Sequence, residues 1–161
     1  MQQGLPEVYP RLWRFALTLT GQRQAADDLA QATALRALEQ AGKFQPGTHL
    51  DRWLLVMARR VWLNELRSAH TKNSQGFVPI EEVAPVAPGG DAETNIFARQ
   101  VLNQVMALPE AQRETVLLVY VEGYSYREAA EILDVPIGTV MSRLAAARGK
   151  LANAMPTKDG K

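Results

Sequence analysis

The segment from Ser125 to Leu151 constrains the fold of this chain most, because its pattern is typical of a helix-turn-helix. Ser125 and Glu128 have the S-x-x-E spacing of a capping box, which marks a helix start. Pro136 then interrupts the pattern and suits the first turn of a second helix. The spacing predicts these inward positions: Ala129, Ala130, Ile132 and Leu133, then Val140, Leu144, Ala147 and Leu151. Many proteins enter the major groove of DNA with such a motif, although an ordinary helical hairpin is the alternative.

The outward face of the second helix is the candidate DNA-contacting surface. Its polar and basic positions are Thr139, Ser142, Arg143, Arg148 and Lys150. Met141, Ala145 and Ala146 share this face, so it is only modestly basic.

Charge is distributed unevenly along the chain. The net charge is +1. Residues 1–72 hold ten basic and six acidic residues, and residues 73–94 hold four acidic residues and no basic one. Residues 95–161 hold eight basic and seven acidic residues. Because nucleic acid attracts local basic surface, the N-terminal part is a candidate for contact with DNA or RNA.

The absence of cysteine excludes disulfides and thiolate metal sites and fits a reducing cytoplasm. No apolar run approaches the roughly 18 residues that span a bilayer, so we expect no membrane insertion. The opening residues lack the basic and apolar segments of a secretion signal.

Helical periodicity predicts an all-α fold made of two small helical domains. In the first domain it predicts helices over 5–20, 25–41 and 50–69, with Gly21 and Gly42 ending the first two. The second helix should carry Asp27 and Asp28 in its first turn, and its expected inward residues are Leu29, Ala32, Leu35 and Leu38.

The third predicted helix combines aromatic and basic residues. Its expected apolar face is Trp53, Leu54, Met57, Val61 and Leu66, which leaves Arg52, Arg59, Arg60 and Arg67 toward solvent or a partner. Tryptophans among arginines could stack on unpaired bases, but a core position is the favoured interpretation for Trp53.

Residues 73–94 predict a flexible acidic linker, because they hold three prolines and three glycines without a helical period. The second domain should begin near Asn95. Its next helix is expected to open at Pro109 and to end at Gly123, before the helix-turn-helix. No segment shows the alternation of a strand.

Residue patterns for catalysis are absent from the sequence. His49 and His70 are isolated, and there is neither a phosphate-binding P-loop nor a nucleophile elbow. We therefore expect no enzymatic activity, no metal ion, no cofactor and no small-molecule substrate.

Several ordered motifs together resemble the extracytoplasmic-function group of sigma-70-type sigma factors. Residues 28–38 are similar to the family's D-L-x-Q-x-T-x-L-R-A-x segment, and residues 52–59 to its x-W-L-x-x-I-A-R segment. Residues 108–130 resemble the start of its region 4, and residues 136–148 its recognition helix. The resemblance covers residues 5–153 and is more specific than a helix-turn-helix alone.

The resemblance implies a protein without catalytic activity that binds core RNA polymerase and directs it to promoter DNA. Residues 5–72 would be region 2, which binds polymerase and the −10 element, and residues 95–153 would be region 4, which reads the −35 element. By position, the polymerase contact would comprise Asp28, Leu29, Gln31, Thr33 and Arg36. The −10 contact would comprise Arg59, Arg60, Asn64 and Arg67. The −35 contact would comprise Thr139, Met141, Ser142, Arg143, Ala145, Ala146 and Arg148.

The sequence departs from the family pattern at several of these positions. Ala32 stands where many relatives have glutamate, and Arg60 where asparagine is frequent. Met141, Ala145 and Ala146 stand where longer, often basic residues are common. Short apolar groups can touch a thymine methyl but cannot bond bidentately to guanine. We therefore expect −35 recognition to rely on phosphate contacts, DNA shape and methyl packing.

The resemblance also implies an anti-sigma factor that covers the DNA surfaces of both domains. The chain would be cytoplasmic, and nucleoid-associated when bound to polymerase. Two other interpretations stay open: a sigma-like decoy that sequesters an anti-sigma factor, and a plain helix-turn-helix repressor.

Overall fold

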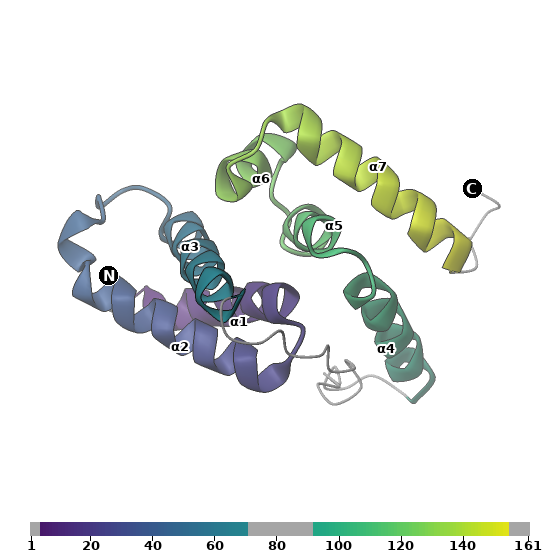
Figure 1. Ribbon diagram of the computed structural model, residues 1–161, viewed down its shortest axis with the longest axis horizontal. Coiled ribbons are helices and arrows are strands. Elements are labelled where there is room, and N and C mark those ends of the chain that lie inside the picture. The colour runs from purple at the N-terminus through teal and green to yellow at the C-terminus, as the bar shows by residue number, and fades with distance from the viewer. Residues whose placement is uncertain (1–3, 71–91, 155–161) are drawn as a thin grey trace. The chain divides into compact units, whose positions relative to one another are not determined.

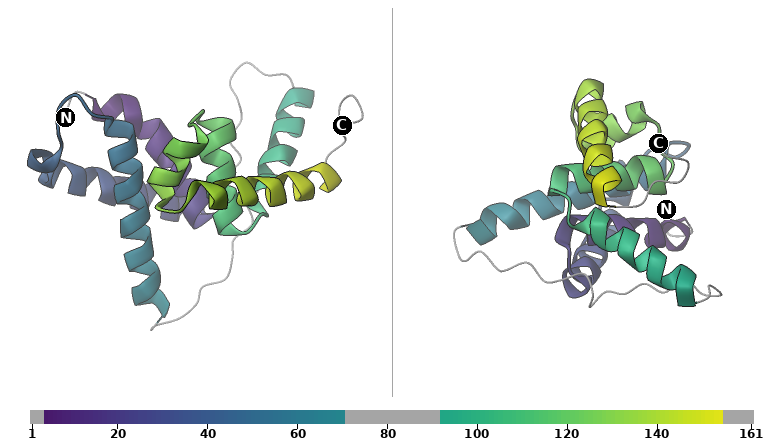
Figure 2. Two further views of the ribbon diagram at one scale, coloured as in Figure 1. Left: turned by 90° about the horizontal axis from the view of Figure 1, so that it is seen from above. Right: turned by 90° about the vertical axis from the view of Figure 1, so that its right-hand side faces the viewer.

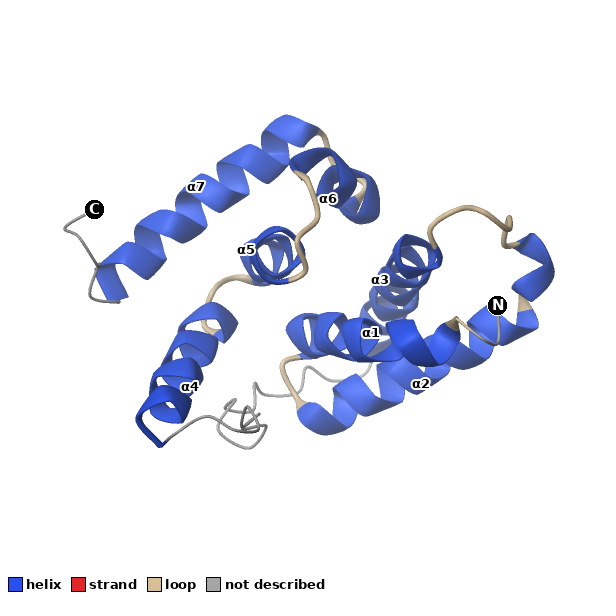
Figure 3. Cartoon of the chain, turned by 180° about the vertical axis from the view of Figure 1, so that it is seen from behind, coloured by secondary structure: helices blue, strands red, loops and turns tan. Residues whose placement is uncertain are grey.

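The computed structural model describes residues 4–70 and 92–154, whose regular elements are all helical (Figures 1 and 3). Contacts within the chain divide it into two compact units, 1–78 and 79–161. The predicted all-α fold of two helical units is thus confirmed. Most of the predicted linker, 73–94, lies outside the described residues. None of the described helices is long and apolar enough to cross a membrane.

The first unit is a bundle of three helices that pack against one another (Figure 2). Its elements are α1 (Leu5–Thr20), α2 (Arg23–Glu39), a short 3-10 turn η1 (Ala41–Lys43) and α3 (Leu50–His70). Gly21 ends α1 as predicted, with φ 74° and a 2.8 Å hydrogen bond from its N–H to the carbonyl of Leu17. The largest fully buried side chains of this unit are Phe15, Leu12, Leu19, Leu29, Leu54 and Leu55.

The predicted inward face of α2 is largely wrong. Leu29 is buried, but Ala32 is exposed, Leu35 is 60% exposed and Leu38 is 39% exposed. The buried residues of α2 are instead Ala26, Leu29, Ala30, Thr33 and Ala37. Because α2 packs against both α1 and α3, small side chains on its inner face let the three axes approach closely. The larger leucines are left on the surface.

The boundaries of α2 also differ from those predicted. The helix begins at Arg23, so Asp27 and Asp28 lie in its second turn and not in the first. Asp27 accepts a 2.6 Å hydrogen bond from the indole nitrogen of Trp13 and so ties α2 to α1. Gly42 does not end the helix, because α2 stops at Glu39 and Gly42 lies in η1.

Helix α3 packs on the bundle through its first half. Leu54 and Met57 are buried as predicted, and Trp53 packs against them with its ring 5.2 Å from that of Phe44. The core interpretation of Trp53 is therefore confirmed. Leu66 was expected to face inward but is 39% exposed, because the last turns of α3 run past the ends of α1 and α2 (Figure 2, left).

The second unit places α5 in the middle of its helices (Figure 1). Its elements are α4 (Ala92–Met106), α5 (Glu110–Val116), a π turn η3 (Leu117–Val121), α6 (Tyr126–Leu133) and α7 (Ile137–Ala154). α4 begins three residues before the predicted Asn95, and Pro109 caps α5 from outside the helix. The chain leaves η3 through Gly123, whose φ is 81°.

The predicted helix-turn-helix is formed by α6 and α7. The hydroxyl of Ser125 accepts the N–H of Glu128 at 3.0 Å, and the carboxylate of Glu128 accepts the N–H of Ser125 at 2.8 Å. Asp134, with φ 56°, ends α6. Of the predicted inward residues of α7, Val140, Leu144 and Ala147 are fully buried and Leu151 is partly buried.

Removal of the cap tests how much the motif depends on this start signal. We expect Ser125→Ala to lower the free energy of unfolding by about 1 kcal/mol, because one capping hydrogen bond to an N-terminal amide is lost. Urea unfolding followed by far-UV circular dichroism measures this. Ser142→Ala, at an exposed site inside α7, is the matched control. Equal midpoints for the wild type and Ser125→Ala would contradict the capping role.

Candidate nucleic-acid interface

The predicted −35 residues lie on α7, on the side away from the core. Five of them are exposed: Met141, Ser142, Ala145, Ala146 and Arg148. Thr139 and Arg143 are half-buried at the edge of this face. The surface formed by these seven residues is called the α7 face below.

A row of small residues runs along the exposed side of α7. Gly138, Ser142, Ala145 and Gly149 follow one another at intervals of three or four residues and so lie in one row. A Cβ atom at Gly138 or Gly149 would meet nothing within 4 Å, so the fold itself does not require glycine there. The result is a helix surface of low relief, which can approach another surface closely.

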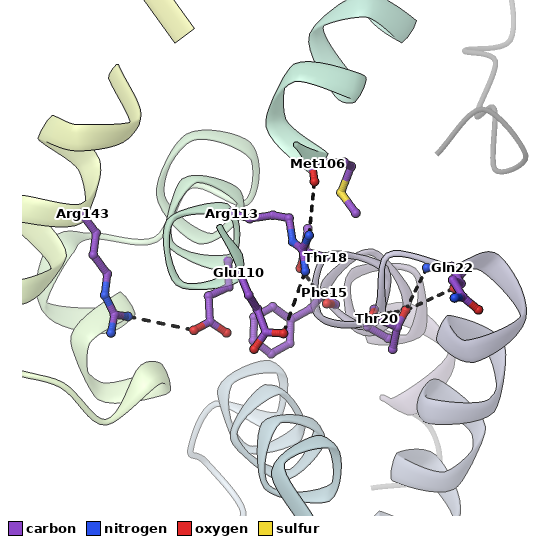
Figure 4. A network of polar contacts seen from close by, with 10 residues as sticks. Phe15, Thr18, Thr20, Gln22, Met106, Glu110, Arg113 and Arg143 are labelled. Carbon is purple, nitrogen blue, oxygen red and sulfur yellow. Dashed lines mark hydrogen bonds and ion pairs between the residues drawn. The ribbon is translucent and has the colours of Figure 1, made fainter. Parts of the chain in front are cut away.

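Arg143 is anchored to the interior of the unit. Its guanidinium lies 4.0 Å from a carboxylate oxygen of Glu114 on α5, and Figure 4 shows the side chain directed from α7 toward α5. The side chain of Glu114 is 3% exposed and that of Arg143 is 22% exposed. This ion pair adds a charge contact between α7 and α5. It also means that part of the charge of Arg143 is balanced from inside.

A buried arginine, Arg113, joins α4 to α5. Arg113 donates a 3.2 Å hydrogen bond to the carbonyl of Met106 at the end of α4, as Figure 4 shows. It also lies 3.9 Å from the carboxylate of Glu110. Burial lowers the pKa of Arg113, while the carboxylates of Glu110 and Glu114 act in the opposite direction. Arg113 and Glu114 look like ordinary surface charges in the sequence, and only their burial reveals their role.

Arg148 is held differently from Arg143. Its guanidinium donates a 2.6 Å hydrogen bond to the hydroxyl of Tyr120, which is an exposed, uncharged partner. Hydrogen bonding to Tyr120 and to Tyr126 raises the pKa of Arg148. Because the partner is an uncharged hydroxyl, this contact leaves the positive charge of Arg148 unbalanced.

The predicted −10 residues lie along the outer half of α3. Arg60, Asn64 and Arg67 are exposed, and their spacing of four and three residues places them on one side of the helix. Arg59 is half-buried beside them. The structure thus brings three of the four residues onto one basic strip.

The predicted polymerase residues divide into two groups on α2. Asp28, Gln31 and Arg36 are exposed. Leu29 and Thr33 are buried, and the Thr33 hydroxyl donates a 2.8 Å hydrogen bond to the carbonyl of Leu29. In this conformation their side chains support the helix from inside and do not reach its surface.

Two exposed leucines extend the surface of α2 beyond the predicted set. Leu35 and Leu38 follow Asp28 and Gln31 at helical spacing, so these four residues share one side of α2. Sequence reasoning missed both leucines, because it assigned them to the core. An apolar pair beside polar residues is typical of a protein-binding surface.

The described parts of the chain contain no candidate metal site. Among residues 4–70 and 92–154, no three histidine or acidic side chains gather in a group that could hold an ion. His49 is exposed, and the side chain of His70 lies outside the described residues.

The anchoring of Arg143 gives a prediction about stability. We expect Arg143→Ala to lower the free energy of unfolding by about 1–3 kcal/mol, because it removes the arginine that faces the buried carboxylate of Glu114. Arg148→Ala is the control, since it removes an exposed arginine of the same helix and should leave the midpoint unchanged. Urea unfolding compares the two variants. Equal effects of both substitutions would contradict the anchoring role of Arg143.

Comparison with known proteins finds sigma factors that match both units of the chain. The family model "Sigma-70 region 2" matches residues 7–71, and "Sigma-70, region 4" matches residues 98–151. The chain is 35% identical over 153 residues to the ECF RNA polymerase sigma factor EcfG of Rhodopseudomonas palustris, covering 94% of this chain and 83% of that protein. It is 35% identical over 146 residues to the ECF RNA polymerase sigma factor SigM of Mycobacterium tuberculosis, covering 90% of this chain and 71% of that protein.

A solved structure extends this likeness to the fold. The sigma factor RpoE of Bartonella quintana, crystallised in complex with the anti-sigma factor NepR, superposes with a TM-score of 0.76. The two chains are 26% identical, and the match covers 95% of this chain and 94% of that one.

Proposed function

Since this chain belongs to the extracytoplasmic-function sigma factors of the sigma-70 family, we propose that it binds core RNA polymerase and directs it to specific promoters. The family is not enzymatic. We assign region 2 to residues 5–72 and region 4 to residues 95–153, with residues 73–94 as the linker between them. The observation that carries the proposal is the match to both regions in the order that a sigma factor requires. Its place of action is the cytoplasm, at the nucleoid when bound to polymerase.

Region 2 carries the proposed polymerase contact on α2. Asp28, Gln31 and Arg36 supply polar and charged groups, and the exposed Leu35 and Leu38 supply apolar area. We propose that Leu29 and Thr33 belong to this contact indirectly, because they are buried and hold α2 in place.

Region 2 also carries the proposed −10 contact, on α3. Arg60, Asn64 and Arg67 form the exposed strip, and Arg59 borders it. Cations along this strip can follow the DNA backbone while unpaired bases are held apart. Trp53 is packed in the bundle and is not assigned to base stacking.

Region 4 carries the proposed −35 contact on the α7 face. The low relief of Gly138, Ser142, Ala145 and Gly149 fits a helix that lies close to the floor of a groove. Met141 offers a methyl group to thymine, and Arg148 offers a cation to phosphate. The composition of this face supports recognition through DNA shape, methyl packing and phosphate contacts.

An anti-sigma factor is the proposed regulatory partner. The related sigma factor of Bartonella quintana forms a complex with an anti-sigma factor, and the likeness spans nearly the whole of both chains. We propose that such a partner covers the DNA-contacting strip of α3 and the α7 face, so that promoter binding requires its release.

The proposal is tested by run-off transcription with purified core RNA polymerase on a pooled promoter library, with and without this protein. We expect protein-dependent transcripts whose templates share −10 and −35 motifs. An absence of transcripts with intact polymerase binding would contradict the proposal and favour a decoy for an anti-sigma factor. An absence of polymerase binding would favour the repressor interpretation.

The apolar part of the polymerase contact gives a second prediction. We expect Leu35→Ser to weaken binding to core polymerase roughly tenfold, since burying a leucine side chain contributes about 1.5–3 kcal/mol. Competition binding of the labelled full chain to core polymerase without DNA measures this. Leu66→Ser, at the exposed leucine of α3, is the matched control and should leave the affinity unchanged. Equal affinities for both variants would refute the assignment of α2.

The proposed mode of −35 recognition gives a third prediction. Arg148→Ala should weaken holoenzyme binding to all −35 sequences by a similar factor, because a phosphate contact carries no sequence information. It should also reduce the slope of log affinity against log salt by about 1. Binding to a panel of single-base −35 variants measures both effects. A loss confined to one base position would show instead that Arg148 reads that base.

A further inference from the structure

Three exposed side chains from three elements of the second unit meet at one end of the α7 face. Arg148 lies on α7, Tyr120 on the π turn η3, and Tyr126 is the first residue of α6. The hydroxyl of Tyr120 accepts the 2.6 Å hydrogen bond from Arg148, while Tyr120 and Tyr126 are 49% and 36% exposed. Hydrogen bonds to both hydroxyls stabilise the charged form of Arg148 and so raise its pKa.

The π turn explains how Tyr120 reaches this position. Val116 and Leu117, four and three residues earlier, are both buried. A continuous α-helix would place Tyr120 on the same side as these two residues. The turn is instead widened by a 2.9 Å hydrogen bond from the N–H of Glu122 to the carbonyl of Leu117, five residues apart. With this wider turn, Tyr120 is exposed and its hydroxyl bonds to Arg148 of α7.

We propose that Tyr120 is a positioning residue which, together with Tyr126, holds the guanidinium of Arg148 ready for a backbone phosphate of the −35 DNA. This inference rests on the proposed function of the α7 face. It adds two residues, outside the recognition helix, to the set that determines promoter affinity.

The chemistry of the cluster suits a phosphate. A guanidinium has five N–H donors, and the tyrosine hydroxyls occupy only some of them. The cluster therefore presents a cation in a fixed direction with N–H donors left for a phosphate, and such cations contact phosphate in protein–DNA complexes.

The contrast between the two arginines of the α7 face supports this assignment. Arg143 is anchored by the carboxylate of Glu114, which balances its charge. Arg148 is held by a neutral hydroxyl, which fixes its direction and leaves its charge in place. An exposed arginine otherwise loses rotamer freedom when it binds, and a side chain held in advance loses less.

The test is a double-mutant cycle on the holoenzyme assembled from core polymerase and the full chain. Tyr120→Phe removes the hydroxyl and keeps the ring. We expect it to weaken binding to an active promoter three- to fivefold, by a similar factor for every −35 variant. In the Arg148→Ala background the same substitution should have no further effect, because its role acts through Arg148. Tyr126→Phe should show the same dependence with a smaller loss.

Val121→Ala, at the exposed neighbour in the same turn, is the matched control and should bind like the wild type. Promoter binding by Tyr120→Phe that equals or exceeds that of the wild type overturns the inference. An equal loss with and without Arg148 also overturns it, because that result describes a structural role independent of the arginine. If the wild-type holoenzyme itself shows no promoter-dependent binding, the proposed function fails, and this outcome is distinct from the other two.

Discussion

The burial of α5 is the constraint on which the second unit depends. Six consecutive residues, 113–118, are buried, and the first three of them are polar. Buried polar groups destabilise a fold unless they are paired, so each of these side chains requires a partner. Arg113 bonds to the last turn of α4, Glu114 faces Arg143 of α7, and Thr115 bonds to a carbonyl one turn earlier in α5. The contacts of Arg113 and Glu114 thereby connect the buried helix to the helices on either side of it.

This arrangement determines what the recognition helix presents to DNA. Val140, Leu144 and Ala147 bury one side of α7 and so set the rotation of the helix, and the pair formed by Glu114 and Arg143 adds a charge contact to α5. The opposite side is left with Met141, with short side chains such as Ser142 and Ala145, and with Arg148 as a charged group at its border. A surface of this kind recognises a duplex mainly by its shape and charge, and less by hydrogen bonds to the edges of its bases. The π turn η3 contributes by bringing a tyrosine to Arg148.

The sequence predicts the elements whose signals are local. Capping by Ser125 and Glu128, the glycine end of α1 and the buried row of α7 all follow from spacing, and the structure has each of them. The inner face of α2 could not be predicted, because the helix carries a row of alanines and a row of leucines, and only packing selects between them. The roles of Arg113 and Glu114 and the π turn depend on tertiary contacts, which leave no local pattern. The site residues on α7 could therefore be named from the motif, but the partners that hold them could not.

The central claim is that the α7 face contacts the −35 region while the chain is bound to polymerase. Its most direct test is photocrosslinking with a photoreactive amino acid in place of Ser142, in a holoenzyme that still supports run-off transcription. We predict crosslinks to promoter DNA at the −35 element, and none there when the same group replaces the exposed Glu39 of α2. An active holoenzyme that gives no −35 crosslink from position 142 would contradict the account.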